Sequence, residues 1–81
     1  MYTLYILHSE SLDRYYVGYT NDLSRRLSEH NRKKGKYTDV GIPWTLVYTE
    51  TFSRKESAMD REKYIKVRKS KKFIIELVAQ R

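Results

Sequence analysis

Apolar and polar positions along this 81-residue chain alternate in three segments as they do in β-strands. These segments cover residues 2–8, 15–20 and about 44–51, and they are rich in aromatic and β-branched side chains. Only the short polar stretch 9–14 separates the first two segments, which favours an antiparallel hairpin. The pattern therefore predicts a small, mainly antiparallel sheet of three strands.

Helical signals occupy most of the remaining chain. Asn21 and Asp22 supply an N-cap signal for a helix over about 22–33. The segment SRKE at 53–56 matches a capping box and predicts a second helix reaching about residue 68. Ser70 can cap a short last helix. The segment 33–43, which has two glycines and a proline, is expected to form an ordered loop.

The resulting element order is β-β-α-β-α-α. This order predicts an α/β fold of the α+β type, in which helices flank a small sheet. Neither a repeat nor a low-complexity tract divides the chain, so residues 1–81 are expected to form one domain. Phe73, Ile74 and Leu77 of the last helix are expected to close the core rather than a dimer interface, so we expect a monomer.

The net charge of the chain suggests the kind of partner that it binds. Seventeen Lys and Arg against ten Asp and Glu leave a net charge of +7, and the excess gathers in 21–43 and 53–81. A basic surface attracts polyanions, usually nucleic acid, although net charge also serves solubility. The absence of cysteine excludes disulfides and thiolate metal sites. No apolar run reaches the roughly 20 residues of a membrane span and no signal peptide is evident, so we expect a cytoplasmic protein.

Two polar side chains fall beside the apolar stripe of the first predicted helix. Leu23 and Leu27 define that stripe, and Arg26 and His30 lie on the same side, one turn apart. Because buried polar groups need partners, these two either belong to a site or lie at the rim with their heads in water. The same geometry directs Glu29 elsewhere.

The second predicted helix repeats the pattern with opposite charge. Glu62 lies within an apolar side that Met59 and Ile65 mark, where a carboxylate is rarely placed for packing. It either pairs with Arg26 or Lys66 or is held for a metal ion or a reaction. Since Mg²⁺ is often bound through one or two carboxylates plus water and phosphate oxygens, a single Glu suffices for a phosphodiesterase site.

Taken in order, these residues resemble a known family. The run TLY at 3–5, the run YVG at 16–18, then Arg26, His30 and Glu62 resemble the GIY-YIG nuclease superfamily. The stretches DLSRRLSEHN and REKYIK are similar to those of its small single-domain YhbQ-like bacterial members. Thr3-Leu4 replace the Gly-Ile of the first family motif, and the Asn that many members carry after the last helix has no match.

The resemblance implies a metal-dependent endonuclease that hydrolyses nucleic-acid phosphodiester bonds, in DNA rather than RNA, in repair or recombination. Tyr5 would be the general base for the attacking water, and Tyr16 would orient that water or substitute for Tyr5 as the base. Arg26 would hold the scissile phosphate, and His30 would bond to a tyrosine hydroxyl or move its proton. Glu62 would hold one Mg²⁺ or Mn²⁺ ion. The alternative is a nucleic-acid-binding module of the same fold with little or no cleavage.

Five further residues are expected to bind the substrate. Gly18 would permit close approach of the backbone, although a strand bulge explains a glycine there equally well. Tyr37 stands near a family position in the loop after the first helix. The cations Lys36, Lys66 and Lys69 would contact phosphates, the other account being ordinary solvated charge.

Overall fold

The computed structural model describes residues 1–32 and 37–80. Within these residues the strands are β1 (Tyr2–Ser9), β2 (Arg14–Thr20) and β3 (Trp44–Phe52). The α-helices are α1 (Leu23–His30), α2 (Lys55–Val67) and α3 (Lys71–Ala79), and the 3-10 helix η1 (Tyr37–Gly41) precedes β3. The predicted order β-β-α-β-α-α and the α+β class are confirmed. None of the helices in the described ranges is long and apolar enough to cross a membrane.

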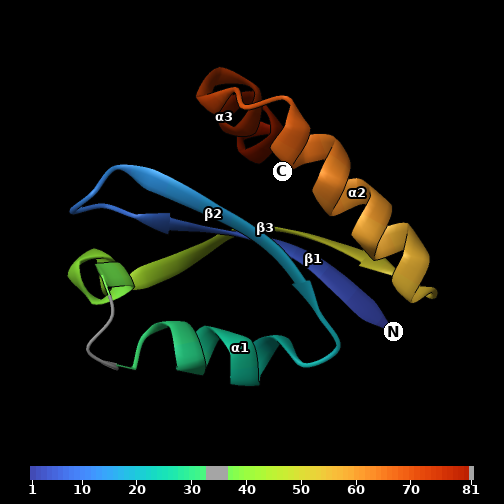
Figure 1. Ribbon diagram of the computed structural model, residues 1–81, viewed down its shortest axis with the longest axis horizontal. Coiled ribbons are helices and arrows are strands. Elements are labelled where there is room, and N and C mark those ends of the chain that lie inside the picture. The colour runs from blue at the N-terminus through green and yellow to red at the C-terminus, as the bar shows by residue number, and fades with distance from the viewer. Residues whose placement is uncertain (33–36, 81) are drawn as a thin grey trace.

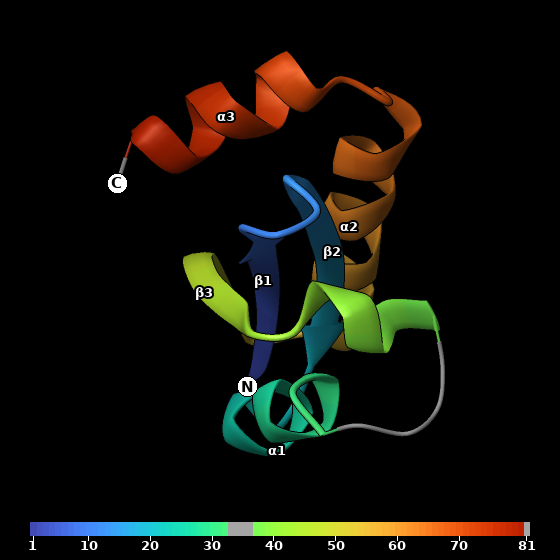
Figure 2. The same cartoon turned by 90° about the vertical axis from the view of Figure 1, so that its left-hand side faces the viewer.

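The sheet is antiparallel throughout, with the strand order β2-β1-β3. β1 is central, and its pairing with β2 runs in unbroken register from the hairpin, whereas its pairing with β3 shifts once, between Ile6 and Leu7. α1 covers one face of the sheet, and α2 and α3 cover the other (Figure 1). α2 contacts β2, so this helix lies along the edge strand (Figure 2). The β2 edge therefore lies between α1 and α2.

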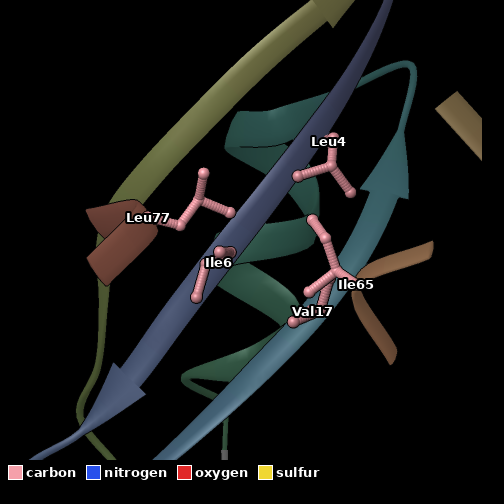
Figure 3. Close-up of a cluster of buried hydrophobic side chains, with 5 residues drawn as sticks. All are labelled: Leu4, Ile6, Val17, Ile65 and Leu77. Atoms are coloured by element: carbon pink, nitrogen blue, oxygen red, sulfur yellow. The ribbon is translucent and has the colours of Figure 1, made fainter. Parts of the chain in front are cut away.

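Alternation along β1 sends successive side chains to two separate core clusters. On the α2 and α3 side, Leu4 and Ile6 are fully buried against Val17 of β2 (Figure 3). Ile65 of α2 and Leu77 of α3 complete this cluster. The half-buried Phe73 and Ile74 pack against it, so the prediction that the last helix closes the core is confirmed.

The second cluster lies on the α1 side. Tyr5 and Leu7 of β1 and Trp44 of β3 are its buried members. Leu23 and Leu27 of α1 pack against them, half-buried, which confirms the predicted apolar stripe of this helix. A tyrosine and a tryptophan therefore form much of the floor beneath α1.

Two of the three helix starts follow the predicted capping signals. Asp22 accepts a hydrogen bond from the backbone N–H of Arg25 at 3.1 Å, and Ser70 accepts one from Phe73 at 3.0 Å. The end of α1 differs from the prediction, because the helix stops at His30 and not at 33. The side chain of Asn31, the C-cap, instead bonds to both backbone groups of Trp44, at 2.6 and 3.0 Å. These bonds tie the end of α1 to the start of β3.

The capping box predicted at 53–56 is wrong. β3 continues to Phe52, and Arg54 is still extended, with φ −118° and ψ 139°. Arg54 is therefore the N-cap of α2, without a side-chain hydrogen bond, and Ser53 lies one residue too far from the helix to cap it. Glu56 pairs with Arg54 at 3.8 Å.

Candidate active site

Tyr5 and Tyr16 come together on the α1 face of the sheet. In the β1–β2 register Tyr5 is opposite Gly18 and Tyr16 is opposite Leu7, so both tyrosines point to the same face. Their ring centroids are 6.3 Å apart, with 23° between the ring planes. The Tyr5 side chain is 1% exposed, whereas Tyr16 is half-buried. The resemblance alone selected these two among eight tyrosines, and the sheet register places them side by side.

Gly18 provides the space that Tyr5 occupies. A Cβ atom at Gly18 would lie 2.7 Å from the Tyr5 hydroxyl oxygen and 3.1 Å from a ring carbon of Tyr16. Any side chain there would displace the hydroxyl. The β1–β2 register runs through Gly18 without interruption, so the strand bulge, the other account of this glycine, is wrong.

α1 supplies a histidine and an arginine to the two tyrosines. The Nε2 atom of His30 lies 3.4 Å from the Tyr5 hydroxyl oxygen, and the His30 ring centroid lies 4.5 Å from that of Tyr16. Arg26, one turn earlier, donates a hydrogen bond to the Tyr5 hydroxyl. Both side chains are half-buried, so the helical pattern located them correctly beside the apolar stripe.

Glu29 is a residue that the helical pattern misplaced. It was expected to point elsewhere, but its carboxylate pairs with Arg26 at 3.4 Å and with Arg25 at 3.5 Å. Its side chain is only 25% exposed. The available signal was its spacing of three and four residues from two arginines, at which helical side chains meet. Glu29 therefore restrains the guanidinium that contacts Tyr5.

α2 brings a carboxylate and an ammonium to the β2 edge. Glu62 pairs with Lys66 at 3.4 Å, which is one of the two partners that the sequence predicted. The Lys66 ammonium also lies 5.8 Å from the centroid of the Tyr16 ring. Met59 was expected on the buried side of this helix, but it is 43% exposed. The buried stripe of α2 is narrow, consisting of Ala58 and Ile65, because the helix packs along a sheet edge.

The surroundings of Tyr5 shift the pKa of its hydroxyl. Burial raises the pKa of the Tyr5 hydroxyl above its ordinary value of 10.0, and the hydrogen bond from Arg26 opposes this rise. Tyr16 and the Glu62 carboxylate add to the rise. In turn, the hydrogen bond to Tyr5 raises the pKa of Arg26. Tyr5 therefore keeps its proton at neutral pH, and side chains from β2, α1 and α2 all act on it.

The same positions carry the family match. Residues 1–73 match the model of the GIY-YIG catalytic domain. The chain belongs to the GIY-YIG family. The match covers β1 through the first turn of α3 and includes the tyrosines, Arg26, His30 and Glu62.

Similar proteins place the chain among the UPF0213, or YhbQ-like, members of the GIY-YIG family, as predicted. The UPF0213 protein YazA of Bacillus subtilis is 49% identical over 65 residues, which are 76% of this chain and 66% of YazA. The UPF0213 protein SpyM3_1077 of Streptococcus pyogenes is 46% identical over 70 residues, or 84% of this chain and 74% of that protein. The solution NMR structure of UPF0213 protein BH0048 from Bacillus halodurans is similar, with a TM-score of 0.63 at 31% identity, covering 100% of this chain and 86% of that one.

The donor set of this GIY-YIG site fits one hard divalent ion. No three His, Asp or Glu side chains gather in residues 1–32 and 37–80, so the described residues form no multi-ligand cage. The Glu62 carboxylate raises the pKa of Tyr5 and pairs with Lys66, whose ammonium lies 5.8 Å from the centroid of the Tyr16 ring, so Glu62 lies beside the cluster. Mg²⁺ is commonly held by one or two carboxylates, with water and phosphate oxygens filling the remaining positions. Glu62 is sufficient for that mode of binding.

The residues predicted to bind substrate have different outcomes in the structure. Gly18 lies against Tyr5, and Lys66 and Lys69 line a hollow beside the site. Lys36 lies outside the described residues. Tyr37 opens η1, but its side chain is not among the described ones.

Proposed function

We propose that this protein is a metal-dependent endonuclease that hydrolyses phosphodiester bonds of DNA, in the cytoplasm, during repair or recombination. The observation that supports the proposal best is the polar cluster at Tyr5 of a GIY-YIG domain, in which the Tyr16 ring lies 6.3 Å from the Tyr5 ring and His30 Nε2 lies 3.4 Å from the Tyr5 hydroxyl oxygen. Structural tyrosines need no such set of polar neighbours. The net charge of +7 supports a polyanionic substrate.

In this proposal Arg26 binds the scissile phosphate and offsets the negative charge that develops in the transition state. Its pairing with Glu29 restrains the guanidinium at the β2 edge before substrate arrives. Glu62 would hold Mg²⁺ or Mn²⁺, which when bound would supply Lewis acidity for the leaving oxygen.

Proton transfer begins from a protonated Tyr5. Because burial raises the pKa of Tyr5, the hydroxyl must lose its proton before it can accept one from water. His30 lies 3.4 Å from that hydroxyl and is the group that takes the proton, while Arg26 stabilises the resulting phenolate. Tyr16 orients the attacking water. Tyr5 then serves as the general base.

A nucleic-acid-binding module with little or no cleavage is the second candidate. The observation that favours it is the direction of the Tyr5 shift, since a raised pKa disfavours a base. In addition, the Glu62 carboxylate already has a partner in Lys66. Both candidates bind nucleic acid, so only the formation of products separates them.

The deciding experiment incubates the protein with single-stranded, duplex and branched DNA, with and without Mn²⁺. Glu62→Ala is the test variant, and Glu56→Ala, an exposed glutamate in the first turn of the same helix, is the matched control. We expect Mn²⁺-dependent products from the wild type and the control, and a loss of about 10²-fold or more in Glu62→Ala. Binding without products would support the second candidate. Products that Glu62→Ala leaves unchanged would contradict the metal assignment.

A further inference from the structure

A hollow of about 380 Å³ lies beside the candidate active site, between β2 and the junction of α2 with α3. This volume falls within the roughly 300–1,000 Å³ typical of small-molecule sites. Tyr16 and Lys66 line the hollow and also belong to the cluster around Tyr5, so the hollow adjoins that cluster at the β2 edge of the sheet. The reaction proposed above uses none of the other residues of the hollow.

The walls of the hollow are apolar and aromatic. Val17 and Ile65 are buried core residues, and the half-buried Tyr15 and Ile74 pack against the same cluster. Tyr15 and Tyr16 are neighbours on the edge strand, so aromatic side chains flank the strand on both of its faces. A flat, apolar group is the kind of ligand that such walls suit.

The rim of the hollow is cationic. Four of its side chains are basic and one is acidic: Arg14, Lys66, Lys69, Lys71 and Asp13. Asp13 neutralises Lys71 at 2.6 Å, and Glu62 neutralises Lys66 at 3.4 Å. Arg14 and Lys69 have no ion pair with any residue in the described ranges, so these two cations remain to bind an anion.

An apolar aromatic interior with a cationic rim is complementary to a nucleotide, which joins a flat base to a phosphate. Bases stack on aromatic side chains without regard to sequence, and phosphates bind Lys and Arg. A base that is paired within a duplex cannot enter such a hollow, so only an unpaired or extruded nucleotide can fill it.

We propose that this hollow binds one unpaired nucleotide of the DNA strand, next to the phosphate that is cleaved. The base lies between Tyr15 and Ile74, and the phosphate contacts Lys69 and Arg14. This inference rests on the proposed function, since it takes Arg26 to hold the neighbouring scissile phosphate. It assigns the enzyme a preference for strands with an unpaired nucleotide, such as single strands and bulges, over continuous duplex.

Binding can be tested without catalysis. We would titrate ¹⁵N-labelled protein, free of divalent ions, with a thymidine dinucleotide and with the same phosphate backbone carrying abasic residues. The backbone amides of Val17, Lys69 and Ser70 are expected to shift with the thymidine ligand, and the abasic ligand is expected to bind about tenfold more weakly. Equal binding of both ligands, or shifts that avoid the hollow, would overturn the proposal.

A pair of variants tests the rim. Lys69→Gln removes a rim cation, whereas Lys63→Gln removes an exposed lysine of α2 that does not line the hollow. In Lys69→Gln we expect a several-fold loss of affinity at low salt, and a salt dependence of log K that is shallower by about 0.7. Lys63→Gln is expected to match the wild type. Equal losses in the two variants would contradict a defined rim site.

A cleavage assay tests independently whether the hollow binds an unpaired nucleotide. We expect Mn²⁺-dependent cutting of a duplex with one bulged thymidine at a fixed distance from the bulge, and slower cutting of the fully paired duplex. Equal rates on both would count against the hollow. The titration contains no divalent ion, so its failure bears on the hollow alone, whereas a lack of products from every substrate bears on the proposed function.

Discussion

Tyr5 and Gly18 face each other across the β1–β2 ladder, and a Cβ atom at Gly18 would lie 2.7 Å from the Tyr5 hydroxyl oxygen. The hydroxyl of a buried tyrosine in the central strand thus occupies the space of a missing side chain on the edge strand. This arrangement lets Tyr5 keep its ring in the core while its hydroxyl contacts Arg26 and His30 of α1.

Gly18→Ala is expected to abolish this arrangement. The new methyl group would displace the Tyr5 hydroxyl, and a misplacement of about 1 Å can lower a rate by roughly 10²-fold. Overpacking of this kind also costs about 1–3 kcal/mol of stability. Cleavage assays and urea unfolding would measure the two effects.

Gly41→Ala is the matched control for that variant. A Cβ atom there would lie 2.7 Å from a ring carbon of Trp44, so the steric conflict is similar but spares Tyr5. We expect Gly41→Ala to lose stability and to keep most of its cleavage activity. An equal loss of activity in the two variants would mean that general destabilisation, and not the position of the hydroxyl, explains the Gly18 result.

Tyr5→Phe is expected to change how stability depends on pH. Burial raises the folded-state pKa of Tyr5 above its ordinary value of 10.0, so its contribution is complete below pH 10.0 and is lost as pH rises through the folded pKa. Tyr5→Phe should therefore lose stability less steeply above that pH in urea unfolding. Burial raises the pKa of Tyr48 as well, so a weaker dependence will persist. Identical slopes for the wild type and the variant would contradict the shift.

Glu50 of β3 and Arg61 of α2 form an ion pair, with two donor–acceptor distances of 3.0 Å. Burial alone would raise the pKa of Glu50, but the hydrogen bonds from Arg61 and Tyr48 lower it below 4.5. We expect Glu50→Gln to cost about 1–3 kcal/mol at neutral pH without altering cleavage. The wild type should lose this advantage as pH falls below 4.5, through the folded pKa of Glu50, which urea unfolding across that range would measure.

Glu62→Ala and Arg26→Ala are expected to lose cleavage activity and to keep their stability, which is the opposite of the result expected for Glu50→Gln. The pair of Glu62 with Lys66, whose side chain is 52% exposed, is a surface pair that contributes little stability. Each variant should therefore lose cleavage activity and keep a melting temperature close to that of the wild type. A large fall in melting temperature for Glu62→Ala would identify Glu62 as a member of a structural ion pair.

Lys69→Gly separates stability from binding. Lys69 has φ 48° between α2 and α3, a left-handed conformation that costs a side chain about 1 kcal/mol and costs glycine almost nothing. We expect the variant to melt roughly 4–8 °C higher and to bind the thymidine dinucleotide more weakly. Lys63→Gly, within α2, should instead lose about 1 kcal/mol. If Lys69→Gly is more stable than the wild type but binds the thymidine dinucleotide equally well, Lys69 does not contribute to binding in the hollow.

The sequence by itself determined the number, order and type of the β-strands and α-helices, because periods of two and of 3.6 residues are local properties of these elements. It did not predict the 3-10 helix η1, which lies within a segment expected to be a loop. It also selected Arg26, His30 and Glu62, since a polar group beside an apolar stripe is visible in the periodicity of one helix. It selected Tyr5 and Tyr16 only through resemblance to a family. The sequence predicted the ends of the helices less well. Ser53 does not cap α2, and α1 ends before Asn31, because contacts with the sheet decide where a helix begins and ends.

The tertiary structure alone decided how these groups meet. The strand register set Gly18 against Tyr5, and the packing of α2 along the β2 edge brought Lys66, with its ion-pair partner Glu62, to the ring of Tyr16. The hollow beside them exists only because β2, α2 and α3 meet there. Such contacts join residues that are distant in the chain, and they depend on how whole surfaces pack, which the periodicity of a single element does not encode.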